Sequence, residues 1–285
     1  MRSSPRAAPA APPARWSART SSSRSTGSPP RPRRGTGVGE ARVSVVTGAA
    51  AGIGRATVHK LAGRGDFVLG VDRDAAGLDA LREEVGADER IATLPADLAE
   101  PEAAEAVVLH CVQRWGRLDL LALVAGIGQF GATAEVSLAE WDWVLNVNLR
   151  APFLLAQAAM PYLVRSRGCV VAVSSIAGLQ GWPYSAVYSA SKGGLVTLMR
   201  SLAIEYGPAG VRVNVVCPGG VETALSADFH SGGVAYDESL RKRSTGLQGR
   251  KADPAEVAAT IAFLGAPEAS FVSGAVLRVD GGAFA

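Results

Sequence analysis

The sequence has 285 residues, of which 48% are hydrophobic, and a formal net charge of +3. Residues 1–39 contain eight arginines and no acidic residue, which leaves 21 basic and 26 acidic side chains, a net charge of −5, for residues 40–285. This distribution argues against a nucleic-acid-binding surface on the main part of the chain. The sequence has no run of 18 or more apolar residues, so we predict no transmembrane helix and no membrane partner.

The cysteines and histidines have no regular spacing. An odd number of unpaired cysteines is typical of buried thiols in a reducing compartment, so we expect a cytoplasmic protein. The scattered histidines lack the spacing of metal ligands, and we predict no metal site. These residues are Cys111, Cys169, Cys217, His59, His110 and His230.

Residues 1–40 are rich in Pro, Ser, Ala and Arg. Such a segment cannot bury enough apolar surface to offset its chain entropy, and we predict a disordered extension. The Arg- and Ser-rich composition also suits an organelle transit peptide, although its prolines oppose a long amphipathic helix, and it lacks the apolar core of a secretory signal. A misassigned start, with the natural chain beginning near Val38, is a third alternative. We expect one folded domain over residues 41–285.

From residue 42 onward, short apolar runs alternate with longer helix-like stretches. Strands that are apolar almost throughout are typical of a sheet covered on both faces, and alternating β and α units give a parallel sheet with right-handed crossovers. The sequence therefore predicts an α/β fold: a doubly wound, Rossmann-type three-layer sandwich with a seven-stranded parallel sheet. The predicted strands are 42–48, 66–72, 90–97, 118–126, 168–175, 211–220 and 274–282, and helices are predicted at 52–65, 81–85, 101–115, 138–164 and 187–206.

A glycine-rich turn, TGAAAGIG at residues 47–54, separates the first strand from its helix. Glycines allow the backbone to approach a pyrophosphate, and the helix N-terminus supplies amide donors and partial positive charge. The alternative is a tight loop with no ligand. The position directly after the first strand favours a dinucleotide site that includes Gly48, Gly52, Ile53 and Gly54.

Asp72 ends the second strand, 18 residues after Gly54. An acid there can bind the ribose hydroxyls of the adenosine and would repel a 2′-phosphate, so we favour NAD over NADP. Arg55 and Arg73 complicate this prediction, because either could contact a 2′-phosphate. The alternative role for Asp72 is a helix N-cap.

Asp97 ends the third strand and is followed by Leu98. We expect this pair to meet the adenine of the cofactor. A second N-cap, before the helix that follows, is an equally good interpretation of Asp97.

Tyr188 and Lys192 lie one helical turn apart in AVYSASKGG, residues 186–194, so their side chains share one helix face. The small residues around them leave room for a large ligand. A chance pair on a surface helix is the alternative. A tyrosine has a pKa near 10, and a neighbouring ammonium lowers it, which would suit Tyr188 to proton transfer at neutral pH.

Seven motifs in order resemble the short-chain dehydrogenase/reductase family, in its compact single-domain branch. The resemblance covers residues 42–283 and implies an oxidoreductase that acts on CH–OH groups with NAD(P). The motifs are TGAAAGIG, the Ala-Asp pair at 96–97, VNL at 147–149, VSSIAG at 173–178, YSASK at 188–192, PGGVET at 218–223 and VDGG at 279–282.

The resemblance implies four catalytic residues. Tyr188 would be the acid/base, and Lys192 would lower its pKa and bind the nicotinamide ribose. Ser175, thirteen residues before Tyr188, would hold the substrate oxygen and stabilise developing charge, whereas Ser174 is only its neighbour. Asn148 would hold a water molecule that links Lys192 to solvent.

The resemblance also implies further cofactor contacts. Val221 and Thr223 would hold the nicotinamide carboxamide, although residues 218–220 could instead form a plain turn. Ala125 and Gly126 would pack along the cofactor. The family usually has two asparagines just before this pair, where the chain has Leu123 and Val124. We therefore expect an altered local hydrogen-bond network with activity retained.

Residues 224–250 resemble the mobile substrate lid of the family. We expect these residues and residues 179–184 to contact the substrate, a small secondary alcohol or ketone. Trp182 and Tyr184 suggest an apolar wall, with core or interface packing as the alternative, and Gln129 and Phe130 are weaker candidates. By resemblance, the helices at 138–164 and 187–206 and the last strand imply a homodimer or homotetramer. An NADP-dependent 3-oxoacyl-carrier reductase and a non-catalytic nicotinamide-binding scaffold remain as alternative functions.

Overall fold

The computed structural model describes residues 41–86, 88–226 and 247–285, and its seven strands form one parallel sheet. The predicted seven-stranded parallel sheet is confirmed, and each predicted strand contains an observed one. In spatial order the strands are β3 (Ile91–Pro95), β2 (Phe67–Asp72), β1 (Val43–Thr47), β4 (Leu120–Leu123), β5 (Cys169–Val173), β6 (Arg212–Pro218) and β7 (Val276–Val279).

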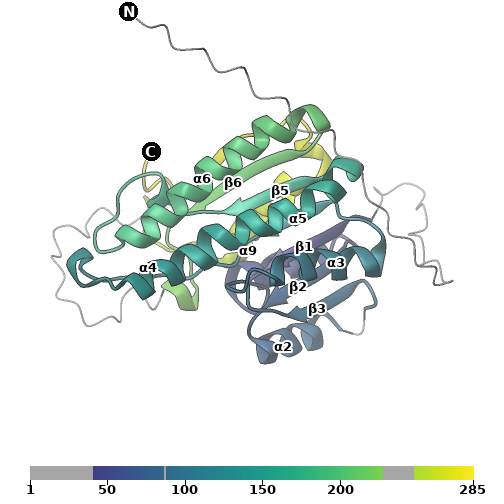
Figure 1. The fold of residues 1–285 in the computed structure, drawn as a ribbon, viewed down its shortest axis with the longest axis horizontal. Coiled ribbons are helices and arrows are strands. Elements are labelled where there is room, and N and C mark those ends of the chain that lie inside the picture. Colours follow the sequence, from purple (N-terminus) through teal and green to yellow (C-terminus); the bar gives the residue numbers. More distant parts are fainter. Residues whose placement is uncertain (1–40, 87, 227–246) are drawn as a thin grey trace, which may run out of the picture.

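Helices cover both faces of the sheet, which gives the expected three layers (Figure 1). The helices α3 (Ala103–Trp115), α5 (Ala151–Ser166) and α6 (Ala186–Tyr206) pack on one face. The helices α1 (Gly52–Ala62), α2 (Ala75–Val85) and α9 (Pro254–Gly265) pack on the other. Successive strand residues alternate between these layers: Val45 belongs to the first core cluster and Val46 to the second, as the two-residue period of a strand requires.

The helix predicted at 138–164 is interrupted. The helix α4 (Leu138–Leu145) begins with a capping box formed by Ser137 and Glu140. A single π-helical turn, η2 (Asn146–Arg150), then separates it from α5. Such π-turns are frequent at functional sites because they change the direction in which one side chain projects. Here the turn contains Asn148.

The helix α9 was not predicted, although the sequence contains a signal for it. Asp253 accepts a hydrogen bond from the backbone N–H of Ala255 at 2.7 Å, and the backbone N–H of Asp253 donates to Glu256 at 2.8 Å. Pro254 occupies the first helical position. An acidic cap followed by proline and, three residues after the cap, by glutamate is a recognisable helix start.

Two predictions concern residues that lie outside the described part of the chain. They are the disordered extension at 1–40 and residues 227–246 of the expected lid, which include His230. Within the described ranges, none of the helices combines the length and the apolar character needed to cross a bilayer.

Candidate active site

A cavity of about 830 Å³ lies at the carboxyl ends of the strands. In open parallel sheets this edge is where ligands bind. The cavity brings together several predicted site residues: Ile53, Gly126, Ser175, Tyr188, Lys192, Val221 and Thr223. The other predicted residues are not part of its lining: Gly48, Gly52, Gly54, Asp72, Asp97, Leu98, Ala125 and Asn148.

The glycine-rich turn packs too closely for side chains. A Cβ atom at Gly54 would lie 1.9 Å from the carbonyl oxygen of Gly48, so only glycine fits there. A Cβ atom at Gly52 would lie 3.0 Å from the methyl group of Thr223, which places the turn beside the segment after β6. Ala51 precedes α1 and provides no side-chain cap, so the first-turn amides of this eleven-residue helix are suited to a phosphate.

Asp72 braces the glycine-rich turn. One carboxylate oxygen accepts from the backbone N–H of Ala50 at 3.0 Å, and the other accepts from that of Asp74 at 3.1 Å. The N-cap of α2 is Asp74, whose side chain accepts from Gly77, so the N-cap interpretation of Asp72 was wrong. The Asp72 side chain is partly exposed at the end of β2, where an adenosine ribose can reach it.

The two arginines that complicate cofactor preference differ in their surroundings. Arg55 forms a two-pronged ion pair with Glu84, at 2.9 and 2.5 Å, and also donates to the carbonyl of Ala50 at 3.3 Å. Arg73 is exposed next to Asp72. Glu84 therefore engages one of the two cations that could meet a 2′-phosphate.

Asp97 and Leu98 have separate roles in the fold. Asp97 is exposed and accepts from the backbone N–H of Ala99 at 2.9 Å. The helix α3 begins later, after Glu102, so Asp97 is not its N-cap and that alternative was wrong. Leu98 is buried in the core cluster on the α3 side of the sheet, which accounts for its absence from the cavity lining.

Thr47 joins β1 to the end of β4. Its hydroxyl oxygen accepts from the backbone N–H groups of Val124 and Ala125, both at 3.0 Å, and the hydroxyl donates to the carbonyl of Ala122 at 3.5 Å. Three hydrogen bonds of one hydroxyl therefore hold the end of β4 against β1. The threonine on β1 thus connects the two strands, and whether activity is retained with Leu123 and Val124 in place of asparagines stays a prediction.

Gly126 allows a close approach between three elements. A Cβ atom there would lie 2.9 Å from the Lys192 ammonium nitrogen and 3.3 Å from the side-chain oxygen of Asn148. A larger residue would displace one of these groups. Both are buried, so their displacement would lower the stability of the fold. The absence of a side chain at Gly126 therefore leaves the space that the Lys192 ammonium occupies.

Asn148 is fully buried in the π-turn, and both the oxygen and the NH2 group of its side chain form hydrogen bonds. Its NH2 group donates to the carbonyl of Ile127 at 2.9 Å and to the hydroxyl of Ser191 at 3.1 Å. Its oxygen accepts from the backbone N–H of Ile127 at 2.9 Å. The side chain joins the loop after β4 to α6, and the water molecule that the resemblance implies at Asn148 stays a prediction.

Ser191 was missed at the sequence level. Its hydroxyl accepts from Asn148 and donates to the carbonyl of Tyr188 at 2.7 Å, and the residue is fully buried. It therefore connects the π-turn to the backbone of the helical turn that carries Tyr188 and Lys192. The available signal was its place inside the YSASK motif.

The two serines after β5 point to different partners. The Ser174 hydroxyl is buried and donates to the backbone carbonyl of Lys192 at 2.8 Å. Ser175 lines the cavity, its oxygen accepts from the backbone N–H of Ala177 at 3.1 Å, and its side chain is hydrogen-bonded to Tyr188. Ser175 is therefore the serine that contacts the Tyr188 side chain, as the prediction of its role requires.

Tyr188 and Lys192 are 7% and 3% exposed, respectively. Burial raises the pKa of Tyr188 to about 12, and the hydrogen bond from Ser175 opposes this shift. Burial lowers the pKa of Lys192 to about 8, and its ammonium donates to the carbonyl of Val173 at 3.0 Å. The expected depression of the Tyr188 pKa is wrong for the chain without cofactor, because loss of hydration is the largest influence and raises the pKa, although the Lys192 nitrogen lies 5.8 Å from the ring centre.

Val221 and Thr223 follow β6 in a paired segment. Val221 forms an isolated parallel bridge with Ala252, and Glu222 donates from its backbone N–H to the carbonyl of Ala252 at 2.9 Å. Residues 220–222 are therefore held in place by the segment that precedes α9. The interpretation of this region as a plain turn does not account for this pairing. Both Val221 and Thr223 line the cavity.

The donor set fits a nicotinamide dinucleotide. An uncapped helix N-terminus, a carboxylate at the end of β2 and a cavity over the ends of β4 to β7 lie along one edge of the sheet. This order suits the pyrophosphate, the adenosine ribose and the nicotinamide. Among the described residues, no group of three or more His, Cys, Asp or Glu could hold a metal ion.

Comparisons with known proteins agree with this geometry. The family described as enoyl-(acyl carrier protein) reductase matches residues 48–283. The 3-oxoacyl-(acyl-carrier-protein) reductase of Thermotoga maritima is 35% identical and aligns with 85% of this chain and 98% of its own. The cis-4-hydroxycyclohexanecarboxylate dehydrogenase of Sinomonas cyclohexanicum is 38% identical, over 85% of this chain and 96% of its own.

A solved structure extends the comparison to three dimensions. The 3-ketoacyl-(acyl-carrier-protein) reductase of Brucella melitensis, complexed with NADH, has a TM-score of 0.78 and 30% sequence identity, and the match covers 85% of this chain and 98% of that one. The motifs, the fold and the relatives agree: the chain belongs to the short-chain dehydrogenase/reductase family and is an oxidoreductase acting on CH–OH or keto groups with a nicotinamide cofactor.

Proposed function

We propose that the chain transfers a hydride between NAD(H) and a small secondary alcohol or ketone, with Tyr188 as general acid and base. The observation that carries the proposal is the buried cluster of Ser175, Tyr188 and Lys192 at the cavity wall. A bound nicotinamide supplies the hydride donor or acceptor. The chain's own residues handle the proton and the substrate oxygen.

In the direction of reduction, the Tyr188 hydroxyl gives its proton to the carbonyl oxygen of the substrate. The raised pKa means that this hydroxyl is protonated at neutral pH in the chain alone. Ser175 holds the same substrate oxygen by a hydrogen bond and stabilises the charge that develops there. Lys192, with a pKa of about 8, is mostly charged at pH 7 and favours the phenolate that remains. In oxidation, the phenolate takes the proton back from the alcohol.

Cofactor binding is assigned to two groups of residues. We place the adenosine ribose at Asp72 and the pyrophosphate at the turn that contains Gly48, Gly52 and Gly54. Ile53, Gly126, Val221 and Thr223 would line the nicotinamide side. The preference for NAD over NADP rests on the Asp72 carboxylate and on the pairing of Arg55 with Glu84.

The second candidate is an NADP-dependent 3-oxoacyl-carrier reductase. It is favoured by the activity for which the Thermotoga maritima relative is named. The relative from Sinomonas cyclohexanicum, a dehydrogenase of a hydroxylated ring compound, favours the small-molecule alternative. Tighter binding of NADPH than of NADH would support the carrier reductase.

We also propose a cytoplasmic location and a homodimer or homotetramer formed by one folded domain of residues 41–285. The three cysteines are buried and free, as expected for a reducing compartment. Large apolar side chains are exposed on the helices α4 and α5, including Leu138, Trp141, Trp143 and Phe153. Such exposure is typical of a subunit interface. Analytical ultracentrifugation of the full chain tests this assembly.

The activity is tested with the full chain and a panel of secondary alcohols and ketones. Nicotinamide absorbance is followed with NAD(H) and NADP(H) in parallel, and cofactor binding is measured separately by calorimetry. We expect turnover with NAD(H), and we expect Tyr188→Phe to lower kcat by about 10³-fold or more while NADH still binds. Tyr206→Phe, at the far end of the same helix, is the matched control. NADH binding without turnover by the parent chain would favour the scaffold.

A further inference from the structure

The described lining of the cavity carries more positive than negative side chains. Its carboxylates are Glu256 and Asp280, and its cations are Lys192, Arg250, Lys251 and Arg278. A ligand that fills the cavity therefore meets an excess of positive charge, which favours a ligand that carries negative charge. The partners of each cation decide which of them can pair with such a ligand.

Lys192 and Arg250 already have their roles within the chain. Lys192 is buried and donates to the carbonyl of Val173 at 3.0 Å. Arg250 forms a two-pronged ion pair with Glu256 at 2.7 and 2.8 Å. The Glu256 carboxylate therefore offsets the charge of Arg250.

Lys251 has a neutral partner. Its ammonium nitrogen donates to the hydroxyl of Ser226 at 2.9 Å. Within the described ranges, none of the ion pairs includes Lys251. A hydroxyl uses one of the three donors of an ammonium group and leaves its charge without a counter-ion, so the group can still pair with an anion.

A chain of contacts connects Lys251 to the glycine-rich turn. A Cβ atom at Gly220 would lie 3.4 Å from the Lys251 Cγ atom. Ser226, the partner of the ammonium, donates from its backbone N–H to the hydroxyl of Thr223 at 3.3 Å. The methyl group of Thr223 would lie 3.0 Å from a Cβ atom at Gly52. Lys251 is therefore a near neighbour of the turn that is assigned to the pyrophosphate.

The packing of two helices brings the same groups together. The helices α1 and α9 pack against one another, and α1 begins directly after the glycine-rich turn. The segment just before α9 is bridged to the end of β6 through Ala252 and Val221. Ile53, from the first turn of α1, and Lys251, from the segment before α9, accordingly line the same cavity.

The remaining cation, Arg278, has its contacts in another part of the lining. It lies on β7 and donates to the carbonyl of Phe284. The ring of Phe284 meets that of Trp182 edge-on, with ring centres 6.1 Å apart, in the region of the loop after β5. Asp280, directly after β7, adds a negative charge to this part of the lining. Lys251 is therefore the better candidate for an anion at the glycine-rich turn.

From these contacts we propose that Lys251 binds the pyrophosphate of the dinucleotide, together with the first-turn amides of α1. The amides are neutral donors, and the ammonium would add a full positive charge beside the two phosphates. The flexible four-carbon stem of a lysine allows the ammonium to turn from Ser226 to a phosphate oxygen. This inference rests on the proposed function, because it requires a dinucleotide in the cavity. It depends neither on the substrate nor on the choice between NAD and NADP.

Calorimetric titration of the full chain with NADH, NADPH and ADP-ribose tests the assignment. ADP-ribose keeps the pyrophosphate and lacks the nicotinamide. Lys251→Gln can still donate to Ser226 but has no charge, and it should weaken the binding of all three ligands by about fivefold. Lys251→Arg keeps the charge and should restore most of the affinity. The difference between parent and Lys251→Gln should shrink as salt is raised from about 0.05 to about 0.5 M, because salt screens exposed charges.

Three variants serve as matched controls. Lys60→Gln removes a cation from the last turn of α1, and Arg278→Gln removes the other lining cation that has a neutral partner. Both should change the affinity for ADP-ribose by less than about twofold. Ser226→Ala removes the partner of the ammonium and keeps the charge. If Lys251 served only to hold Ser226, this variant would weaken binding as Lys251→Gln does, whereas we expect no loss.

The outcomes separate the two proposals. Unchanged binding of ADP-ribose by Lys251→Gln would overturn the assignment, and a rise in KM for a ketone would then indicate a substrate contact. A loss for NADH without a loss for ADP-ribose would also overturn it, in favour of a contact with the nicotinamide half. The expected losses in a chain that turns over no alcohol or ketone would support the role of Lys251 and overturn the oxidoreductase. Failure of the parent chain to bind any of the three ligands would overturn both.

Discussion

The two halves of the candidate site place their polar groups in different surroundings. On the adenosine side, Asp72 is partly exposed, and the Arg55–Glu84 pair lies at the surface with 28% and 47% side-chain exposure. On the proton-transfer side, Asn148 and Lys192 are at most 3% exposed, and protein atoms hold both. With the roles proposed above, cofactor preference would depend on groups that water solvates. Proton transfer would depend on buried groups that protein partners hydrogen-bond.

Lys192→Met tests the buried half most severely. We expect turnover to fall by about 10³-fold, because the charge that favours the Tyr188 phenolate is lost. The Lys192→Met variant should nevertheless be more stable than the parent at neutral pH. The folded pKa of Lys192 is about 8, against an ordinary value of 10.5, so the unfolded chain binds more protons between these values.

Burial of this ammonium therefore lowers the free energy of unfolding. The loss is greatest below pH 8 and disappears as the pH rises towards 10.5. The difference in free energy of unfolding between the Lys192→Met variant and the parent should therefore shrink by roughly 3 kcal/mol from pH 7 to pH 10. Urea denaturation at both pH values measures it. Lys60→Met, which removes an exposed lysine from α1, should show no such change. A difference independent of pH would contradict the prediction.

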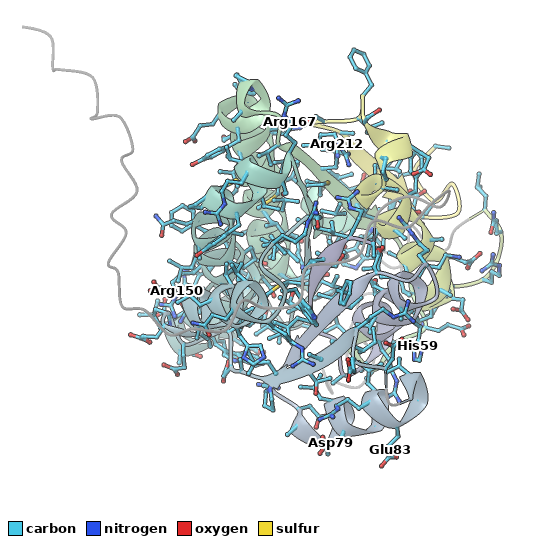
Figure 2. The ribbon with its side chains drawn as sticks, turned by 90° about the vertical axis from the view of Figure 1, so that its right-hand side faces the viewer. His59, Asp79, Glu83, Arg150, Arg167 and Arg212 are labelled. Atoms are coloured by element: carbon cyan, nitrogen blue, oxygen red, sulfur yellow. The ribbon has the colours of Figure 1, made fainter. Side chains whose placement is uncertain are left out.

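Asp72→Asn tests the exposed half. Loss of the negative charge should raise the affinity for NADPH relative to NADH by about 30-fold, because repulsion of the 2′-phosphate is removed. The turn should hold, since an amide oxygen can still accept from one of the two backbone N–H groups. Calorimetric titration with both cofactors gives the ratio, and Asp79→Asn, on the outer side of α2 (Figure 2), is the control. An unchanged ratio would remove Asp72 from the specificity argument.

Ser191→Ala weakens the buried half without removing a reacting group. It leaves the Asn148 NH2 group with one partner fewer and removes the hydroxyl donor from the Tyr188 carbonyl. We expect kcat to fall about tenfold with NADH binding retained. Ser201→Ala, which breaks a serine-to-backbone bond of 3.2 Å farther along α6, should have no effect on kcat. A rise in KM alone would point to a substrate contact instead of a positioning role.

Glu84→Gln is expected to have the smallest effect. It releases Arg55 from its ion pair, and the freed guanidinium should improve NADPH binding by about threefold while NADH binding stays constant. Glu83 projects outward from α2 (Figure 2), so Glu83→Gln removes the same charge without touching Arg55. If both variants improve NADPH binding equally, general charge is the cause and the role of the Arg55 pair is refuted.

The layer order and the sheet were predictable because they follow from apolar periodicity and chain order, which are local properties. The π-turn at Asn148 was not, since nothing in VNL distinguishes a π-turn from a continued α-helix. The high pKa of Tyr188 was missed because the motif shows the neighbouring lysine but not the burial that raises the pKa. The hydrogen bonds of Ser191 and Thr47 join residues 43 and 77–78 positions apart, a separation that motif spacing does not describe.

The bridge made by the Thr47 hydroxyl separates two tasks that one side chain often performs. The Thr47 hydroxyl on β1 holds the two strand ends together through the backbone N–H of Val124. The Val124 side chain therefore lines the cavity and is not needed to join the strands. A change of size at position 124 can then alter the floor of the pocket while the backbone N–H of the new residue keeps its bond to Thr47. A single substitution at position 124 can therefore change which ligands fit the pocket, with a smaller effect on the stability of the fold.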